Sequence, residues 1–360
     1  MVQIQKNKEQ LLREFFSPDS SRPKYVYGLR PQTFYEVNRR LRKTGANIVA
    51  YIDENVSTDA VMGKQVLHSL DSVPSDALVF VADWWFPVTA VNQLIRRNLL
   101  WVDIFSYMFF YNWMELDVPH WKGFVEYYDN HIKEFDSVIG SLADEESKDI
   151  MRRVVHFRRY HDIEQLLVFH PYPEEQYFEP FLELKPDGES FADVGCFDGQ
   201  TSIQFIQRCP QYVRIWAFEP NEGQMEEVKK ILGNYSRITY CPYGAWNKTE
   251  SLHFDSNGGD GSKVSESGDT VIEGRRIDDI IDSEVTFIKM DIEGSESNAI
   301  EGARETILKY HPRLAISVYH RPCDMVVIPQ QVLSIRKDYK IYVRHYTEFV
   351  FETVMFFIPE

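Results

Sequence analysis

The sequence predicts an α/β protein whose C-terminal half forms a doubly wound sheet of five parallel strands ending in an antiparallel hairpin. Three observations lead to this prediction. The 360-residue chain, with 44% hydrophobic residues, has ample material for a buried core. Short β-prone runs alternate with helical segments, which is typical of parallel sheets with right-handed crossovers. The last two runs, 340–344 and 353–358, are joined by a short link that permits a hairpin and no crossover helix.

The chain is expected to have three regions. We predict a small Rossmann-like α/β domain at 1–115, a helical connector at 116–180 and a larger α/β domain at 181–360. In the first region, strands are expected at 25–27, 47–52 and 77–82, and helices at 33–43 and 88–98. The connector carries aromatic residues at helical spacing, which we expect in the core, and its clearest helix is expected at 144–159.

The larger domain has the clearer pattern of alternating elements. Its strands are expected at 190–194, 214–218, 238–242, 286–290, 314–318, 340–344 and 353–358. Helices are expected between them, for example at 224–232 and 296–310. Parallel strands closed by an antiparallel hairpin are the layout of the class I methyltransferase fold, whereas a dinucleotide-binding dehydrogenase domain stays parallel.

Charge and composition argue against several classes of function. The net charge of −16 and the pI of about 5.1 give a surface that repels phosphate backbones and anionic lipids, so no nucleic-acid partner is expected. No window approaches the roughly 20 apolar residues of a membrane span. The chain starts MVQIQKNKEQ, without the apolar core of a signal peptide, and its four cysteines form no C-x-x-C pair. A cytoplasmic protein with reduced thiols is therefore expected.

The segment FADVGCFDGQT, residues 191–201, is the candidate cofactor site, because it joins a predicted buried strand to a predicted helix. Gly195 would let the backbone turn sharply beside a ligand, and Gly199 would permit close approach before the helix. An anionic Asp193 suits the cationic amino and sulfonium groups of S-adenosylmethionine, whereas Asp193 and Asp198 would repel the pyrophosphate of NAD. S-adenosylmethionine is therefore the predicted cofactor, and a tight turn without a ligand is the alternative.

Two further features support this site. Glu219 ends the second predicted strand, in the run FEP, where an acid can accept hydrogen bonds from both ribose hydroxyls. Small residues after the third strand leave room for adenine, which is expected against Ala245 or Trp246. The predicted donor-binding residues are Tyr177, Asp193, Gly195, Cys196, Phe197, Asp198, Gly199, Thr201, Glu219, Pro220, Gly244, Ala245 and Trp246.

From Asp144 to Glu360 the chain resembles the FkbM family of S-adenosylmethionine-dependent methyltransferases. The resemblance is carried, in order, by QYF (176–178), FADVGCFDGQT (191–201), FEP (218–220), FIKMDIEGSE (287–296) and SVYH (317–320). It implies O-methylation of a sugar hydroxyl or another polar secondary alcohol, in glycan, lipopolysaccharide or natural-product pathways. It does not imply a particular acceptor.

The N-terminal region resembles the small Rossmann-like domain found before sugar-modifying enzymes, where it can hold a nucleotide-sugar. The similar features are Tyr27-Gly28, Asp53 and the run LVFVA at 78–82. The region departs from the G-x-G-x-x-G pattern, since Gly28 is followed by LRPQTF, so phosphate binding by backbone amides is not expected. Arg30 could supply a side-chain contact instead. A structural or dimerising domain is the alternative, which leaves the oligomeric state open.

Methyl transfer to an oxygen needs alignment of that oxygen with the sulfonium methyl group and removal of the hydroxyl proton. The predicted strand at 286–290 brings Lys289, Asp291 and Glu293 to the carboxyl edge of the sheet, where like charges raise one another's pKa. Asp291 is the first candidate for the base or orienting carboxylate, and Glu293 is the second. Lys289 would lower the pKa of the acceptor or pair with Asp291.

His320 ends the next predicted strand and is a further candidate base, since histidine ordinarily titrates at about pH 6.5. Glu296 is interpreted as an acid in the first turn of a helix. No metal is predicted, although the acids of this cluster could hold Mg²⁺. The glycine- and serine-rich segment 254–268 is expected to be a mobile loop over the acceptor, with an exposed hairpin as the alternative.

Taken together, these features predict an S-adenosylmethionine-dependent O-methyltransferase acting on a hydroxyl of a sugar or related polar acceptor. The acceptor is expected to be a small molecule or a glycan, with a nucleotide-sugar as one candidate. Two other classes stay open. One is a non-catalytic module that binds a nucleotide-sugar. The other is an NAD-dependent sugar oxidoreductase, which the acidic turn and the terminal hairpin disfavour.

Overall fold

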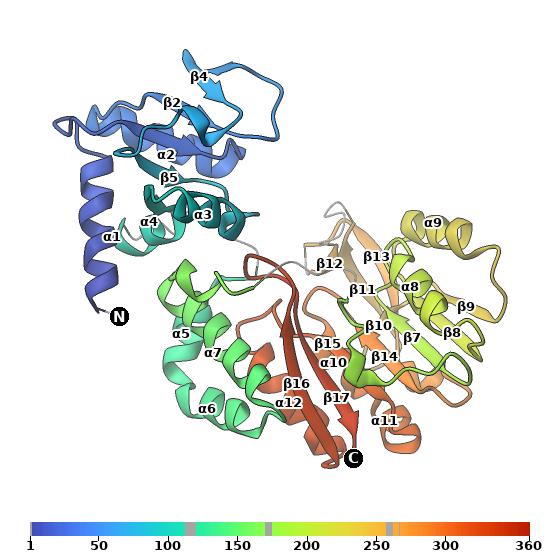
Figure 1. Ribbon diagram of the computed structural model, residues 1–360. Helices are drawn as coiled ribbons and strands as arrows, with labels where there is room; N and C mark the ends of the chain where they lie inside the picture. The colour runs from blue at the N-terminus through green and yellow to red at the C-terminus, as the bar shows by residue number, and fades with distance from the viewer. Residues whose placement is uncertain (1, 112–119, 170–174, 257–261, 266) are drawn as a thin grey trace. The chain divides into compact units, whose positions relative to one another are not determined.

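The computed structural model describes residues 2–111, 120–169, 175–256, 262–265 and 267–360 (Figure 1). The chain forms two compact units. Unit 1 comprises residues 1–118, 153–171 and 347–350, and unit 2 comprises residues 119–152, 172–346 and 351–360. The domain boundary predicted at residue 115 lies outside the described residues, and the predicted helical connector is divided between the two units.

Unit 1 contains a mainly parallel sheet whose strand order, among its described residues, is β3-β4-β2-β1-β5-β6. The strands are β1 (Lys24–Tyr27), β2 (Ala50–Ile52), β3 (Ala60–Val61), β4 (Lys64–Leu67), β5 (Leu78–Val81) and β6 (Leu100–Asp103). Every neighbouring pair is parallel except β3 and β4. The predicted strands at 25–27 and 77–82 are confirmed. β2 is shorter than the predicted 47–52, because its pairing with β1 begins only at Ala50, opposite Tyr25.

The helices of unit 1 are α1 (Val2–Phe15), α2 (Pro31–Thr44), α3 (Pro87–Arg96) and α4 (Ile104–Tyr111). α2 begins with a proline in its first turn and ends at Gly45 in a left-handed conformation (φ 73°), which are favourable start and stop residues. α1 is not predicted by the sequence. A buried ion pair, Lys8 Nζ to Asp103 Oδ2 at 3.2 Å, ties it to the end of β6, and the rings of Phe16 and Phe80 pack nearby in the core.

Unit 2 is built on a seven-stranded sheet, counted over its described residues, with the order β16-β17-β15-β14-β7-β8-β9. The strands are β7 (Ser190–Val194), β8 (Arg214–Phe218), β9 (Ile238–Cys241), β14 (Phe287–Met290), β15 (Arg313–Ser317), β16 (Tyr339–His345) and β17 (Thr353–Pro359). The strands from β15 to β9 are parallel, and β17 lies antiparallel between β15 and β16. The predicted fold, a parallel sheet closed by an antiparallel hairpin, is confirmed.

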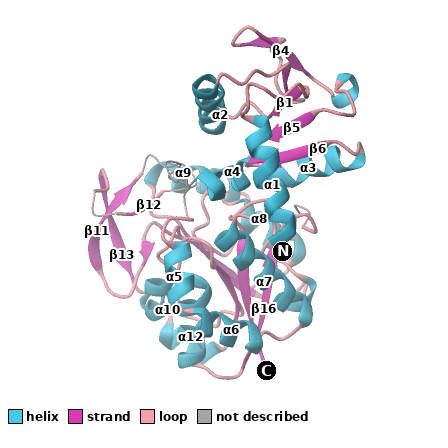
Figure 2. Cartoon of the chain, turned by 90° about the vertical axis from the view of Figure 1, so that its left-hand side faces the viewer, coloured by secondary structure: helices cyan, strands magenta, loops and turns pink. Residues whose placement is uncertain are grey.

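Helices cover both faces of this sheet. They are α5 (Phe124–Asn130), α6 (Ile132–Ser141), α8 (Gln200–Arg208), α9 (Glu222–Leu232), α10 (Glu296–Gly302), α11 (Arg304–Tyr310) and α12 (Asp324–Ile335). The chain runs from β7 toward β9 and later from β14 toward β15, so right-handed crossovers put α8 and α9 on the opposite face from α10 and α12. α6, α12 and α10 pack in series on their face (Figure 2). A further helix, α7 (Glu145–Tyr160), begins in unit 2 and ends in unit 1, and it confirms the predicted helix at 144–159.

The prediction of one continuous helix at 296–310 is wrong, because the structure has two helices there, α10 and α11. The interruption lies at Ala303, whose backbone (φ −107°, ψ 7°) is not helical. A Cβ added at Gly302 would lie 2.0 Å from the main-chain oxygen of Trp246. The end of α10 therefore packs directly against the backbone of the segment that follows β9.

A smaller sheet, absent from the sequence predictions, lies between β9 and β14 in the chain, with the order β10-β13-β11-β12 over the described residues. The strands are β10 (Gly244–Ala245), β11 (Glu250–Asp255), β12 (Lys263–Val264) and β13 (Thr270–Arg275). The segment predicted as a mobile loop, 254–268, contains the end of β11 and all of β12, and the antiparallel pairing of Phe254 with Val264 and of Asp255 with Lys263 agrees with the alternative of a hairpin. Residues 257–261 and 266 lie outside the described residues, so the mobility stays a prediction.

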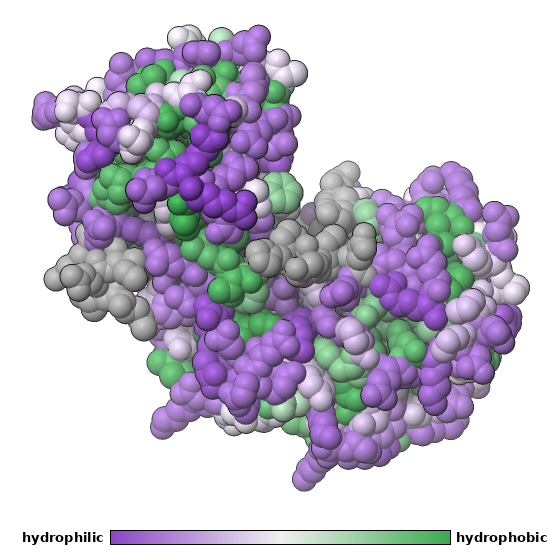
Figure 3. Space-filling model, viewed as in Figure 1, coloured by the Kyte–Doolittle hydropathy of each residue, from purple (hydrophilic) through white to green (hydrophobic). Residues whose placement is uncertain are grey.

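Hydrophilic side chains cover most of the face of each unit that is turned toward the viewer in Figure 3, with apolar side chains in smaller patches. This surface agrees with the net charge of −16. Across the described ranges, no helix combines the length and the apolar character needed to cross a membrane.

Candidate active site

The turn after β7 can be formed only with glycine at position 195. Gly195 has φ 81°, and a Cβ built there would lie 2.0 Å from the main-chain oxygen of Asp291. The amides of Gly195 and Cys196 both donate to the carbonyl oxygen of Phe218 at 3.0 Å, which ties the turn to the end of β8. Gly199 (φ 82°), the residue before α8, is also left-handed. Both predicted glycines therefore shape the backbone of this segment.

A buried ion pair supports the turn from below. Asp193 Oδ2 accepts a hydrogen bond from Ser202 Oγ at 2.8 Å, and its Oδ1 lies 3.4 Å from Lys289 Nζ. Lys289 Nζ also donates to the carbonyl oxygen of Gly195 at 2.5 Å. Burial lowers the pKa of Lys289, but the neighbouring carboxylates raise it by more, so the group stays an ammonium ion. The structure thus brings Asp193 and Lys289 together beneath the turn, and neither lines the cleft above it.

An open cleft of about 650 Å³ lies at the carboxyl ends of β7, β8 and β14. Of the predicted donor-binding residues, it is lined by Gly195, Phe197, Glu219, Pro220, Gly244 and Ala245. Asp291 and Glu293, the two acidic candidates for the acceptor side, line the same cleft. Phe254, Ser262 and Val264, from the segment expected over the acceptor, also line the cleft. Other lining residues, which the sequence did not indicate individually, include Asn221, Gln224, Tyr243, Ile272, Ile292 and Ser295.

The remaining predicted donor-binding residues do not line this cleft. Asp193 and Cys196 are buried, and Thr201 lies in the first turn of α8. The Asp198 carboxylate accepts a hydrogen bond from a main-chain amide at the start of α8 at 3.0 Å. The Trp246 indole is turned to a carboxylate on β11, to which it donates at 2.7 Å. Of the two residues expected beside adenine, only Ala245 borders the cleft.

Glu219 lies where β8 enters the cleft and is only 7% exposed. Its Oε1 accepts a hydrogen bond from the amide of Asn221 at 2.8 Å, which orients the carboxyl group. Burial raises the pKa of Glu219 to about 7, although the main-chain hydrogen bonds oppose this shift. A carboxyl group in this position can accept hydrogen bonds from a vicinal diol when it is ionised.

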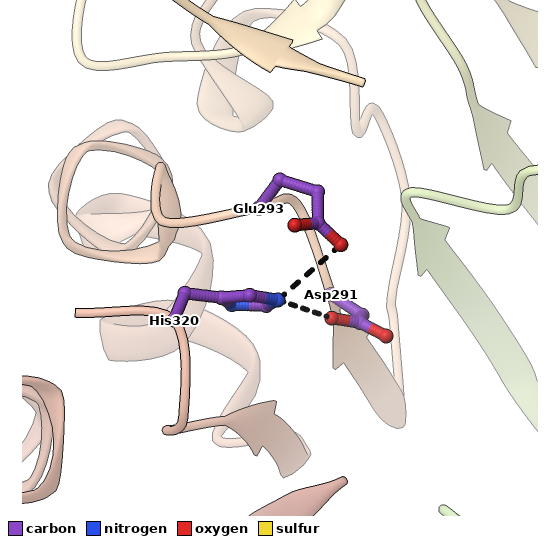
Figure 4. A group of neighbouring side chains, drawn as sticks. All are labelled: Asp291, Glu293 and His320. Carbon is purple, nitrogen blue, oxygen red and sulfur yellow. Dashed lines mark ion pairs between the residues drawn. The ribbon is translucent and has the colours of Figure 1, made fainter. Parts of the chain in front are cut away.

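His320 is surrounded by carboxylates and lies next to Asp291 and Glu293, which line the cleft, without lining it itself (Figure 4). Its Nε2 lies 3.3 Å from Asp291 Oδ1 and 3.4 Å from Glu293 Oε1, and its Nδ1 lies 2.9 Å from Glu296 Oε1. The same Glu296 oxygen accepts a hydrogen bond from the amide of Ile292 at 2.9 Å. Glu296, interpreted from sequence as a first-turn acid, is fully buried and faces the histidine.

The carboxylates control the protonation of His320. Burial alone lowers the pKa of His320, but the surrounding carboxylates raise it well above its usual value. Burial also raises the pKa of Glu293. The pKa of Asp291 is lowered instead, because His320 and Lys289 outweigh the effect of burial. In this arrangement His320 carries a proton and Asp291 is ionised, so Asp291 is better suited than His320 to accept a proton.

A line of hydroxyl and carboxyl groups extends from Asp291. The hydroxyl of Tyr177, a residue predicted to cover the donor, donates to Asp291 Oδ2 at 2.6 Å. The hydroxyl of Tyr319 lies 3.4 Å from Asp291 Oδ1 and 3.3 Å from Glu352 Oε1. Burial and the charge of Asp291 raise the pKa of Glu352 to about 8. The sequence offered no signal for Glu352, which lies in the link before β17 and matches no motif.

His120 is a second histidine that the sequence analysis missed. Its Nε2 lies 3.5 Å from Glu293 Oε2, and its Nδ1 lies 3.3 Å from the carbonyl oxygen of His320. The two imidazole rings meet edge to face with centroids 5.0 Å apart. His120 also has a left-handed backbone (φ 65°), which is uncommon for a residue with a side chain. Its distance along the chain from the other site residues explains why no local motif reveals it.

A parallel sheet closed by an antiparallel hairpin, with a glycine turn after strand β7, is the layout of the class I methyltransferase fold. Residues 193–344 match the family model described as the methyltransferase FkbM domain. These matches support an FkbM-family methyltransferase over this part of the chain.

Two known proteins are similar to this chain. The 2-O-methyltransferase NoeI of Sinorhizobium fredii (strain NBRC 101917 / NGR234) is 26% identical over 150 residues, covering 35% of this chain and 61% of NoeI. The chain thus spans less than two thirds of that relative. The crystal structure of methyltransferase FkbM from Methylobacillus flagellatus KT superposes with a TM-score of 0.70 at 24% identity, covering 98% of this chain and 93% of the other. At that identity the likeness shows the fold alone.

Proposed function

We propose that this protein transfers a methyl group from S-adenosylmethionine to a hydroxyl group of a sugar or a related polar acceptor. The observation that carries the proposal is a single cleft bordered by the glycine turn and Glu219 on one side and by Asp291 and Glu293 on the other. NoeI is named as a 2-O-methyltransferase, which supports transfer to an oxygen.

The donor side of the cleft fits S-adenosylmethionine better than NAD. Because Gly195 has no side chain, its turn packs directly against the main chain of Asp291 at the edge of the cleft, and Glu219 is oriented to accept hydrogen bonds from the ribose hydroxyls. Gly244 and Ala245 are small enough to admit adenine. The cleft lining contains the acids Glu219, Asp291 and Glu293 and neither Lys nor Arg among the described residues, so a pyrophosphate would be repelled. When bound, S-adenosylmethionine would supply an electrophilic methyl group.

The acceptor side can hold a hydroxyl group and take up its proton. Asp291 is ionised and is fixed by the hydroxyls of Tyr177 and Tyr319, which keeps one carboxylate near the centre of the cleft. Such alignment of the reacting groups contributes several orders of magnitude in rate. A positioned base adds roughly 10²–10⁴-fold. We assign Asp291 to accept the hydroxyl proton and Glu293 to bind the acceptor beside it.

Transfer of labelled methyl groups tests the proposal. The purified protein would be incubated with methyl-labelled S-adenosylmethionine and a panel of free, nucleotide-linked and polymeric sugars. We expect label on one class of sugar, in a linkage that survives mild alkali as an ether does, and a loss of at least 100-fold for Asp291→Asn. A protein that binds nucleotide-sugars without transferring label would support the alternative of a non-catalytic module. A protein that oxidises the same sugars with NAD would support an oxidoreductase.

A further inference from the structure

We infer that Asp291, Glu293 and His320 form a binding site for one divalent metal ion on the acceptor side of the cleft. The sequence alone predicts no metal, although it leaves open that the acids of this cluster hold Mg²⁺. The inference deepens the proposed function, on which it rests for what the ion would do. Binding of the ion itself requires neither donor nor acceptor.

The spacing of the three side chains suits coordination. His320 Nε2 lies 3.3 Å from Asp291 Oδ1 and 3.4 Å from Glu293 Oε1, and all three candidate ligand atoms lie within 4.8 Å of one another. Adjacent ligands of an octahedral ion with bonds of roughly 2.1–2.3 Å are about 3.0–3.3 Å apart. The two separations between His320 and the carboxylates are thus within a few tenths of an ångström of those around a shared ion.

The orientation of His320 is a second, independent observation. The side chain is 1% exposed, and its Nε2 points between the two carboxylates of Asp291 and Glu293 (Figure 4). Within the described residues, neither Nε2 nor Nδ1 of this buried ring has a hydrogen-bond partner of acceptable geometry, and Nε2 is the nitrogen that faces the two carboxylates lining the cleft. Nδ1 faces the buried Glu296 at 2.9 Å, and a carboxylate there is the usual partner of a metal-binding histidine, because it keeps the proton on Nδ1 and leaves Nε2 free to bind.

Charge favours an ion at this position. Three carboxylates, those of Asp291, Glu293 and Glu296, lie within 3.4 Å of the His320 ring nitrogens. An imidazolium beside three carboxylates leaves two negative charges, whereas a divalent ion with a neutral imidazole leaves one. The Lys289 ammonium does not neutralise this remaining negative charge, because it is paired with Asp193 and with the main-chain oxygen of Gly195 beneath the turn.

A neighbouring trio, Glu296, His320 and Asp324, is a weaker candidate. All three side chains are buried away from the cleft, and Asp324 Oδ2 already accepts a hydrogen bond from the amide of Arg321 at 2.6 Å. An ion bound there would not meet an acceptor. We therefore assign Glu296 to orienting His320 and place the ion on the side of Nε2.

Two carboxylates and one imidazole suit Mn²⁺ and related transition ions better than Ca²⁺, which prefers oxygen ligands only. Three protein ligands leave coordination positions open for the hydroxyl groups of an acceptor. The ion would polarise the bound hydroxyl, which lowers its pKa. In the reaction an O–CH₃ bond forms as the S–CH₃ bond breaks, and the electron pair of the S–CH₃ bond returns to sulfur. The hydroxyl proton passes to the Asp291 carboxylate, as assigned above, and then to solvent.

Binding of Mn²⁺ alone to the full-length protein tests the inference. The free Mn²⁺ signal in electron paramagnetic resonance would be followed during titration of the wild type, Asp291→Asn, Glu293→Gln and the control Glu284→Gln. Glu284 is an exposed acid outside the cleft, so its variant has the same change in charge. We expect one bound Mn²⁺ per wild-type and control chain, and at least tenfold weaker binding by the two site variants.

Either of two results would overturn the inference: no loss of the free Mn²⁺ signal with the wild type, or equal binding by all four proteins. Circular dichroism confirms that each variant is folded before it is compared. Affinity for S-adenosylhomocysteine, measured in parallel without metal, separates the two proposals. If the protein binds S-adenosylhomocysteine but not Mn²⁺, the proposed methyl donor stands and the metal site is wrong. If it binds Mn²⁺ but not S-adenosylhomocysteine, the metal site stands and the proposed donor is wrong.

Discussion

Replacing Gly195 by alanine tests whether the turn after β7 forms the donor site. A Cβ at this position would lie 2.0 Å from the Asp291 main-chain oxygen, while real Cβ contacts are essentially never under 3.0 Å, so one segment must move by about 1 Å (3.0 − 2.0). The positive φ of 81° adds about 1–2 kcal/mol for a residue with a side chain. Displacement of a ligand-positioning group by about 1 Å can cost on the order of 100-fold in rate. We expect at least tenfold weaker binding of S-adenosylhomocysteine and about 100-fold slower methyl transfer.

Gly188→Ala is the matched control. Gly188 has nearly the same left-handed backbone (φ 79°), but no atom lies within 4 Å of the Cβ it would gain. Both variants should therefore lose stability through backbone strain, and a loss of about 1–2 kcal/mol corresponds to a fall in Tm of roughly 2–8 °C. Only Gly195→Ala should lose affinity in isothermal titration calorimetry. Equal affinity in the two variants would refute the assignment of this turn to the donor.

Three further predictions concern the cleft and its support. The pKa of Glu219 is about 7, and its ionised form accepts hydrogen bonds from the ribose hydroxyls, so affinity for S-adenosylhomocysteine should fall as the pH drops below about 7. Glu219→Gln should bind S-adenosylhomocysteine weakly, with no such pH dependence across pH 5–8. Tyr177→Phe removes a hydrogen bond to the charged Asp291, and such bonds are worth about 1.5–3 kcal/mol. The kcat should therefore fall by roughly 10- to 150-fold, while calorimetry shows unchanged donor affinity. An unchanged kcat would show that Tyr177 does not hold Asp291 in place. Lys289→Met leaves the buried Asp193 carboxylate with the Ser202 hydroxyl but without its cationic partner, which should lower the free energy of unfolding by about 3–5 kcal/mol in urea titrations. Adding Asp193→Asn should restore part of this loss, and purely additive losses would contradict the pairing.

Local sequence predicts the fold and the donor side of the site well. The boundaries of β7 and β8 match the predicted strands residue for residue, since each is a short apolar run that ends at a polar turn. Gly195, Glu219 and Ala245 border the cleft because each follows the carboxyl end of a strand, and that position is fixed by the topology of the sheet.

The acceptor side depends on contacts between distant parts of the chain, which local patterns do not contain. Tyr177 lies 114 residues before Asp291, Glu352 lies 33 residues after Tyr319, and His120 lies 200 residues before His320, so only the folded chain brings these groups together. Such contacts leave no periodicity in the sequence to detect.

Lys289 and Trp246 illustrate a different limit. Sequence places both residues at the correct edge of the sheet, but the direction of a side chain depends on its partners. The Lys289 ammonium binds Asp193 and the Gly195 carbonyl oxygen beneath the turn, and the Trp246 indole donates to the Glu250 carboxylate instead of facing the cleft.

The most direct test of whether this cleft binds a methyl donor is isothermal titration calorimetry of the purified full-length protein with S-adenosylhomocysteine and, separately, with NAD. A cleft with one glycine turn, a ribose-binding carboxylate and an acidic lining should bind S-adenosylhomocysteine with a micromolar Kd and show no heat of binding with NAD. Binding of NAD without binding of S-adenosylhomocysteine would contradict the assignment of this cleft to a methyl donor.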